Sequence, residues 1–144
     1  MNNSGEKRIL SIDYGSKRVG IAITDPLRIF AYPLKTINND SKFWQEFLEI
    51  FNEFEVEKII LGYPLLKSGD KSKSTILVED FHKELGQKLK DIPVELVDES
   101  YSSQKALENI IESVPSKKKR KDKSLIDKNA ASVILQEYLT SIGK

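Results

Sequence analysis

Acidic residues in three separate parts of the chain have the type and position that a metal site requires. Asp13 ends an apolar run, Asp98 and Glu99 follow a second apolar run, and Asp127 precedes a third. A carboxylate inside an apolar stretch needs a nearby charge or hydrogen-bond partner, because burying it alone is costly. Carboxylates from different elements can converge on one divalent cation, so Asp13, Glu99 and Asp127 form a candidate metal site.

Each acidic residue also has an ordinary structural explanation. Asp is common in hairpin turns, as at Asp13, and acidic residues are favoured in the first turn of a helix, as at Asp127. Adjacent side chains of a strand point to opposite faces, so only one of Asp98 and Glu99 can share a face with Asp13. Glu99 is the predicted metal ligand of the two, and Asp98 is the alternative. The glycine of the Asp-x-Gly triplet, Gly15, lets the backbone turn sharply and approach a phosphate or metal closely.

A basic segment lies directly before Asp127. Residues 117–123 contain six basic residues and one acidic residue, whereas the whole chain has a net charge of +1. Like charges in succession resist packing, so residues 113–123 are predicted to form a flexible basic loop. Such a run is most often only a solvated loop, but if Asp127 belongs to the site, the loop lies over it and is predicted to bind a nucleic-acid backbone by releasing counterions. The predicted phosphate contacts are Lys17 and Arg18, next to Asp13, and Lys117, Lys118, Lys119, Arg120 and Lys121 in the loop.

Length and composition limit the classes of protein. The 144 residues suit one domain, and the absence of cysteine excludes disulfides, thiolate zinc sites and cysteine nucleophiles. The sequence has no apolar segment of signal-peptide or membrane-spanning length, so we expect a soluble cytoplasmic protein with no membrane partner. Phosphate-binding glycine motifs of the P-loop and Rossmann types are also absent.

The apolar patterns predict the elements that would position these residues. Residues 8–14 and 18–24 read as a hairpin, which residues 28–36 extend to a meander. Helices are predicted at 41–54, with Ser41 as a candidate N-cap, from Ser74 or Thr75 to about residue 89, at 102–112, and from about Ser124 or Asp127 to Ser141. Parallel strands are predicted at 58–62 and 93–98. This order predicts one α/β domain, residues 1–144, with a mixed five-stranded sheet, part antiparallel meander and part parallel, flanked by helices.

Two other features are more simply structural. His82, the single histidine, has no second histidine or cysteine near it and is taken as structural or surface. Trp44, Phe43, Phe47 and Phe51 follow helical spacing, which favours a core over a base-stacking platform.

Taken together, four blocks of sequence resemble the bacterial YqgF family, Holliday-junction-resolvase-like proteins described as nucleases of precursor 16S rRNA. The resemblance covers roughly residues 8–140. It rests on Ile12–Ala22, on Ile60–Leu65 followed by Gly69, on Val97–Glu99 and on Ile126–Gln136.

The resemblance implies an RNase H-like fold, a cytoplasmic location and hydrolysis of phosphodiester bonds at the 5′ end of precursor 16S ribosomal RNA. It implies catalytic roles for Asp13, Glu99 and Asp127, which would hold one or two Mg²⁺ or Mn²⁺ ions. Leu66, Ser68 and Ser100 stand where the family usually has asparagine, aspartate and arginine. The missing arginine removes a contact to substrate phosphate or to a carboxylate, for which Lys105 or the basic loop is a possible substitute.

Other functions stay open from the sequence alone. A DNA Holliday-junction resolvase would use the same carboxylates, and a symmetric junction favours a two-fold homodimer over a monomer. A non-catalytic nucleic-acid-binding module would have no need of three intact carboxylates. Sugar kinases and actin-like ATPases share the Asp-x-Gly strand and turn, but they need two such domains, which 144 residues cannot supply.

Overall fold

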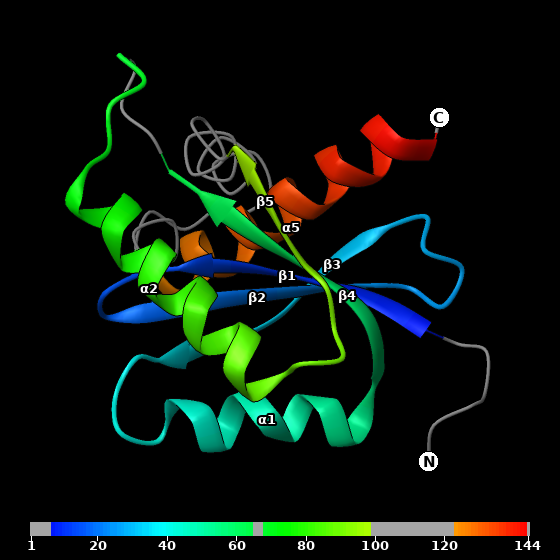
Figure 1. The fold of residues 1–144 in the computed structure, drawn as a ribbon. Coiled ribbons are helices and arrows are strands. Elements are labelled where there is room, and N and C mark those ends of the chain that lie inside the picture. The colour runs from blue at the N-terminus through cyan, green and yellow to red at the C-terminus, as the bar shows by residue number, and fades with distance from the viewer. Residues whose placement is uncertain (1–6, 65–67, 99–122, 144) are drawn as a thin grey trace.

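A computed structural model describes residues 7–64, 68–98 and 123–143, with the backbone alone for 123–129 and 143. Its elements, drawn in Figure 1, are β1 (Lys7–Tyr14), β2 (Arg18–Thr24), β3 (Ala31–Asn38), α1 (Phe43–Glu53), β4 (Glu55–Tyr63), α2 (Lys73–Lys88), β5 (Val94–Asp98) and α5 (Lys123–Gly143).

The five strands form one mixed sheet in the order β3-β2-β1-β4-β5. β2 pairs antiparallel with both β1 and β3, whereas β4 pairs parallel with both β1 and β5. The predicted meander and the predicted parallel strands are therefore confirmed. Because β1, β4 and β5 run in the same direction, they end together at one edge of the sheet. This edge, marked by Tyr14, Tyr63 and Asp98, is here called the carboxyl edge.

Helices cover both faces of the sheet. Figure 1 shows α1 and α2 on one face and α5 on the other. Side chains alternate along β1, so Leu10 and Ile12 enter the core under α1 and α2, while Ile9 enters the core under α5. The second surface is here called the α5 face. Burial on both faces explains why β1 and β4 read as nearly continuous apolar runs.

Aromatic side chains fill the core under α1 and α2. Phe43 and Phe47 are buried with ring centroids 5.4 Å apart, and Trp44 and Phe51 pack against the same core. The prediction that these rings belong to the core is confirmed. His82 lies in the middle of α2 and is half-buried, in keeping with a structural or surface role.

The predicted start of the third strand, at residue 28, is wrong. β3 begins at Ala31 because the preceding residues form a tight loop. The Asp25 carboxylate accepts hydrogen bonds from the amides of Ile29 and Phe30, both at 2.8 Å, and Arg28 has a left-handed φ of 57°. The bond from Phe30 contributes most to lowering the pKa of Asp25.

The helix starts also differ from the predictions in detail. α1 begins at Phe43 with Lys42 at the N-cap position, so Ser41 is not the N-cap. The Asp40 carboxylate instead accepts a hydrogen bond from the Lys42 amide (2.9 Å). α2 begins at Lys73, before both predicted starts, Ser74 and Thr75, because Ser72 caps it.

Part of the prediction lies outside the described residues. The predicted helix at 102–112 falls there, as does nearly all of the predicted basic loop, 113–123, of which only Lys123 belongs to α5. The single-domain organisation stays a prediction. In the described part of the chain, no helix is both long enough and apolar enough to cross a membrane.

Candidate functional site

Asp13 lies one residue before the end of β1 and on the α5 face. Ser11, two residues earlier, is fully buried, and its Oγ donates a hydrogen bond to the Ala131 carbonyl of α5 (2.5 Å). Alternate residues of a strand share a face, so Asp13 points to the same side as Ser11, but nearer the carboxyl edge. Asp13 is only half-buried. A carboxylate at this position can therefore meet an ion or substrate from solvent.

Glycines occupy the positions on both sides of Asp13. Gly20 is its antiparallel partner on β2. On the other side Ile12 pairs with Leu61, so the register brings Asp13 beside Gly62 of β4. Glycine inside a strand often marks a place where a ligand or another backbone approaches closely. Neither glycine is among the predicted site residues, although a glycine within an apolar strand is a signal that the sequence offers.

The other predicted ligands are described to different extents. Asp98 is the last residue of β5 and stands at the carboxyl edge. Asp127 lies in α5, one helical turn before Ala131, and only its backbone is described. Glu99 lies outside the described residues. Within the ranges whose side chains are placed, no three His, Asp or Glu residues come together as a metal-binding group.

The N-terminal end of α5 approaches the carboxyl edge. Gln136 accepts a hydrogen bond from the backbone amide at the start of β3 (3.0 Å), at the opposite edge of the sheet, whereas Ala131 is level with Ser11. One helical turn back from Ala131 to Asp127 spans roughly 6 Å, and two strand residues from Ser11 to Asp13 span roughly 6.6 Å. The backbone at Asp127 thus extends toward the end of the sheet that carries Asp13.

Two of the predicted phosphate-binding cations lie in the described part of the chain. Lys17 is exposed in the turn between β1 and β2. Arg18 opens β2 two residues before Gly20, the partner of Asp13, and therefore lies on the α5 face diagonally from Asp13. Both positions border the Asp13 end of the sheet. The remaining predicted cations, Lys117, Lys118, Lys119, Arg120 and Lys121, lie outside the described residues.

A steric restriction explains why the last residue of the Asp-x-Gly triplet, Gly15, is glycine. A Cβ on Gly15 would lie 2.7 Å from the carbonyl oxygen of Arg18. The tight turn that joins β1 to β2 therefore requires glycine even without a ligand. The approach to a phosphate or metal that the sequence suggested for Gly15 remains a prediction.

A polar cluster joins three elements on the α5 face. The Lys58 ammonium of β4 lies 2.6 Å from the Glu95 carboxylate of β5 and donates a hydrogen bond to the Tyr138 hydroxyl of α5 (2.6 Å). Tyr138 in turn lies 3.5 Å from Glu95. The bond to Glu95, followed by that to Tyr138, raises the pKa of Lys58 above its usual value. None of the three residues is predicted from the sequence, because their partners lie far apart in the chain.

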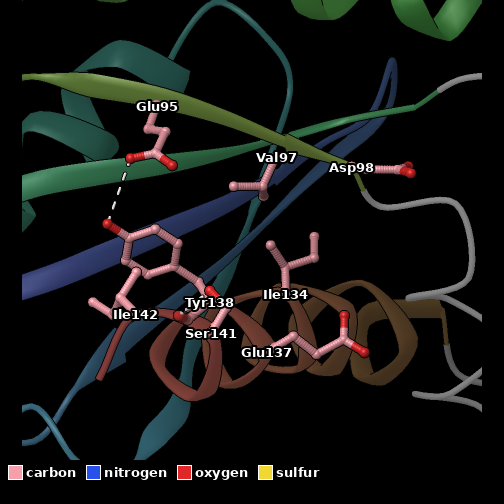
Figure 2. Close-up of a pocket in the computed structure, with 8 residues that line it drawn as sticks. All are labelled: Glu95, Val97, Asp98, Ile134, Glu137, Tyr138, Ser141 and Ile142. Carbon is pink, nitrogen blue, oxygen red and sulfur yellow. Dashed lines mark hydrogen bonds between the residues drawn. The ribbon is translucent and has the colours of Figure 1, made fainter. Parts of the chain in front are cut away.

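A cavity of about 230 Å³ lies beside this cluster, between β5 and α5. Figure 2 shows Val97 and Ile134 facing each other across it, with Glu95 and Tyr138 toward one end and Asp98 and Glu137 toward the other. Ser141 and Ile142 complete the lining. The helical residues recur at intervals of three and four, so one stripe of α5 forms an entire wall. Of these residues, only Asp98 is a site residue predicted from the sequence.

The oxygen donors in the described part of the chain fit a divalent cation. Asp13 offers a half-exposed carboxylate, the hard oxygen ligand that Mg²⁺ and Mn²⁺ prefer. It stands near the carboxyl edge between two glycines, and the first turns of α5 extend toward it. The chain contains no cysteine, and its one histidine is on α2, across the sheet from Asp13. An oxygen-ligand site is the type that these residues can form.

Sequence comparison relates nearly the whole chain to known proteins. Residues 7–141 match the family described as RuvX, Holliday junction resolvase. A protein of Chlorobium phaeobacteroides named "Putative pre-16S rRNA nuclease" is 45% identical over 137 residues, which are 95% of this chain and 94% of the relative. A protein of the same name from Flavobacterium psychrophilum is 41% identical over 134 residues, covering 92% and 96% of the two chains.

Solved structures share the fold. The fowlpox virus resolvase, in complex with Holliday junction DNA, superposes with a TM-score of 0.57 at 16% identity, covering 95% of this chain and 99% of the resolvase. Thermus thermophilus RuvC, with a Holliday junction substrate, gives 0.56 at 13% identity, covering 95% and 96%. These neighbours have an RNase H-like fold, so the predicted fold is confirmed.

Proposed function

The chain belongs to the RuvX (YqgF) family, described as Holliday junction resolvases, and we propose that it is a metal-dependent nuclease that processes the 5′ end of precursor 16S ribosomal RNA. Membership makes it a nuclease, which is a hydrolase of phosphodiester bonds and binds nucleic acid. The substrate, the metal and the residues that hold the metal are the parts proposed.

The position of Asp13 is the observation that supports this proposal most. It combines a carboxylate on the α5 face, half-exposed, with glycine on both neighbouring strands. We assign metal binding to Asp13, Glu99 and Asp127. Val97 points to the α5 face, and Glu99 follows it by two positions in the sequence. Asp98, between them, projects sideways from the end of β5 in Figure 2. Alternation therefore favours Glu99 over Asp98 as the second ligand.

Each group of the chain has a role in this mechanism. A bound Mg²⁺ or Mn²⁺ ion would lower the pKa of the attacking water and stabilise the leaving oxygen. The carboxylates of Asp13, Glu99 and Asp127 would hold this cation. Lys17, Arg18 and the basic residues 117–121 bind the nucleic-acid backbone around the cleaved bond, where each cation that neutralises a phosphate releases counterions.

The proposed substrate, precursor 16S rRNA, is inferred from the relatives that have the higher sequence identity. Those at 41–45% identity are named for precursor 16S rRNA, whereas the structures with DNA junctions are only 13–16% identical. RNA is therefore the first candidate. A DNA four-way junction is the second, because the family description names it. A cytoplasmic location follows from ribosomal RNA as substrate.

Replacing Asp13 tests the proposed function. Purified protein with Mn²⁺ is expected to shorten a precursor 16S RNA fragment at its 5′ end, and Asp13→Asn should lose this activity because one metal ligand has lost its charge. Gel analysis of labelled RNA, with a four-way DNA junction in parallel, measures both substrates. Asp80→Asn, at an exposed position of α2, is the matched control and should cleave normally.

Each outcome separates one part of the proposal. Undiminished cleavage by Asp13→Asn would remove the metal assignment, while a parent protein that binds RNA but never cleaves it would leave a binding module. Cleavage of the DNA junction without cleavage of RNA would make the chain a resolvase.

A further inference from the structure

Four large apolar side chains are exposed close together where β2 turns into β3. The exposed fractions of Leu27, Ile29, Phe30 and Tyr32 are 75%, 46%, 56% and 51%. Figure 1 shows this loop projecting from the sheet at the end opposite the carboxyl edge. The four residues are here called the loop patch. Single exposed apolar residues are common on a protein surface, whereas a group of this size is typical of an interaction site.

Hydrogen bonds hold the loop patch in one conformation. Besides the two bonds that its carboxylate accepts from Ile29 and Phe30, Asp25 donates its amide to the Phe30 carbonyl (3.1 Å). The Gln136 side chain of α5 accepts a bond from the Ala31 amide (3.0 Å) and donates one to the Ile29 carbonyl (3.4 Å). A loop that is already ordered loses little conformational entropy when a partner covers it. The loop is therefore prepared for binding.

The charges beside the loop patch argue against nucleic acid as the partner. Arg28, within the loop, lies 2.9 Å from the Glu57 carboxylate of β4. At the same end of the sheet, Lys7 lies 3.9 Å from Glu55. Each of these cations thus has a carboxylate beside it, which repels a phosphate backbone. Aromatic platforms for single-stranded nucleic acid need cations that follow the phosphates. The loop patch is better suited to an apolar protein surface.

The edge of the sheet next to the loop patch is protected against pairing with a further strand. β3 is an edge strand, but Pro33 has no amide hydrogen to donate. The register with β2 also passes from Lys35 to Pro33 and skips Leu34, which forms a bulge. Prolines and bulges on an edge strand prevent the addition of another strand. A partner would therefore contact the side chains of the loop rather than extend the sheet.

A second copy of this chain has the matching surface. In a two-fold arrangement, the loop patch of one copy faces the loop patch of the other, so apolar side chains meet apolar side chains. The neighbouring charges are also self-complementary. Arg28 and Glu57 are partly exposed and opposite in sign, so each can face the oppositely charged residue of the second copy.

The area of the loop patch fits a weak dimer. Side chains of this size present about 150–250 Å² each when they are fully free. At the exposed fractions given above, the four together leave roughly 400–500 Å² of accessible surface on each copy. Two copies would then bury about 1,000 Å² with their charged rim, the lower limit for a specific interface.

We infer that two copies of this chain associate through the loop patch as a weak, reversible two-fold dimer. This interface lies at the end of the sheet where β1 begins, whereas Asp13 stands near the end of the same strand. The two proposed metal sites would thus lie away from the interface, and each copy would cleave on its own. The inference therefore goes beyond the proposed function and does not depend on it.

Sedimentation of the full chain over a concentration series tests the dimer. The average mass should rise from the monomer value of 16.4 kDa towards twice that value between about 10 µM and about 1 mM. Phe30→Ser should weaken association roughly tenfold or more, because both copies lose an apolar ring at the interface. Ile76→Ser removes a similarly exposed side chain (53%) from α2 and is the matched control, which should associate like the parent.

A pair of charge variants tests the two-fold geometry. Arg28→Glu leaves two negative charges beside the loop patch, and Glu57→Arg leaves two positive charges. Each variant alone should associate roughly tenfold more weakly than the parent, because like charges then face each other across the interface. An equimolar mixture of the two should recover association, since a negative rim then meets a positive one. Mixing that recovers nothing would contradict the two-fold arrangement.

Other outcomes would also overturn the inference. A parent chain that keeps its monomer mass up to about 1 mM forms no such dimer. A dimer that survives Phe30→Ser, or one that Ile76→Ser dissociates, uses another surface. Loss of RNA affinity in Phe30→Ser without a change of mass would assign the patch to nucleic acid instead. RNA cleavage by Phe30→Ser should equal that of the parent, so sedimentation and cleavage report separately on the dimer and on the proposed function.

Discussion

At the scale of single residues, Gly15 and Gly86 make a matched pair. A Cβ on Gly15 would lie 2.7 Å from the Arg18 carbonyl oxygen, whereas a Cβ on Gly86 would meet no atom within 4 Å. Gly15→Ala should therefore destabilise the fold by about 1–3 kcal/mol, as the turn shifts to relieve the overlap. Gly86→Ala, near the end of α2, should stabilise it by about 0.5–1 kcal/mol. Urea denaturation measures both, and equal stability of Gly15→Ala and parent would refute the steric explanation.

The sequence alone predicted some of the charged and polar residues discussed above, but not others. Asp13 stands out in the sequence because a charged residue interrupts an apolar strand. Lys58, Glu95 and Tyr138 do not, since charged residues and tyrosines are common at half-exposed positions. Their contacts join residues 80 and 43 positions apart in the chain, and only the fold reveals them.

At the scale of elements, the N-terminus of α2 depends on a reciprocal cap. The Ser72 hydroxyl accepts a hydrogen bond from the Thr75 amide (3.3 Å), and the Thr75 hydroxyl accepts one from the Ser72 amide (2.9 Å). Thr75 is fully buried and also donates to the carbonyl of Pro64, the residue that follows β4. This arrangement fixes the start of α2 to the strand beside the carboxyl edge.

Removing the cap should cost stability. Ser72→Ala leaves the Thr75 amide without its acceptor, and we expect a loss of about 1 kcal/mol in the free energy of unfolding. Thermal and urea unfolding followed by circular dichroism measure this loss. Ser74→Ala, an exposed position in the same turn, should change stability by less than about 0.5 kcal/mol. A loss at Ser74 as large as at Ser72 would contradict the role of the cap.

Apolar periodicity predicted most elements, and hydrogen bonds by side chains account for the errors. β1, β2, β4 and β5 fall close to their predicted positions, and the apolar runs of β1, β2 and β4 are buried in the sheet. The start of β3 was misplaced, since Ile29 and Phe30 have strand propensity but their amides bind the Asp25 carboxylate. They remain exposed, by 46% and 56%, so no burial favours a strand there.

At the scale of the whole molecule, the Lys58 cluster connects two strands to α5. The pKa of Lys58 is raised from 10.5 in the folded protein, so the ammonium stabilises the fold fully below pH about 10.5 and loses this effect as the pH rises through the folded pKa. The Lys58 and Glu95 side chains are 29% and 46% exposed, and solvent screening limits the contribution to less than about 1 kcal/mol.

Lys58→Met should therefore flatten the alkaline decline of stability. The difference in unfolding free energy between parent and variant should shrink between pH 9 and pH 12. Urea denaturation across this range measures it. Lys90→Met, at an exposed position, provides the comparison and should keep a constant difference from the parent. A constant difference for Lys58→Met as well would show that the cluster does not stabilise the folded state through its charge.

The arrangement of the whole sheet was predicted as a class, and the strand order required the structure. Alternation of strands and helices implies parallel pairing, but it does not say that β4 lies beside β1. The position of β4 determines which residues lie near Asp13, because it brings Gly62 beside Asp13 and places Val97 on the following strand, β5. Pairing between distant segments depends on the total burial of both faces, which no single segment determines.

Because α5 covers one face of the sheet, its place in the chain has a consequence for folding during translation. α5 follows all five strands in the chain, yet its residues bury Ile9, Ala22 and Ile60 of the sheet. A nascent chain leaving the ribosome therefore exposes this apolar surface until α5 has emerged. Asp127, a proposed metal ligand, is carried on the same helix, so the proposed metal site would be complete only after α5 has been synthesised.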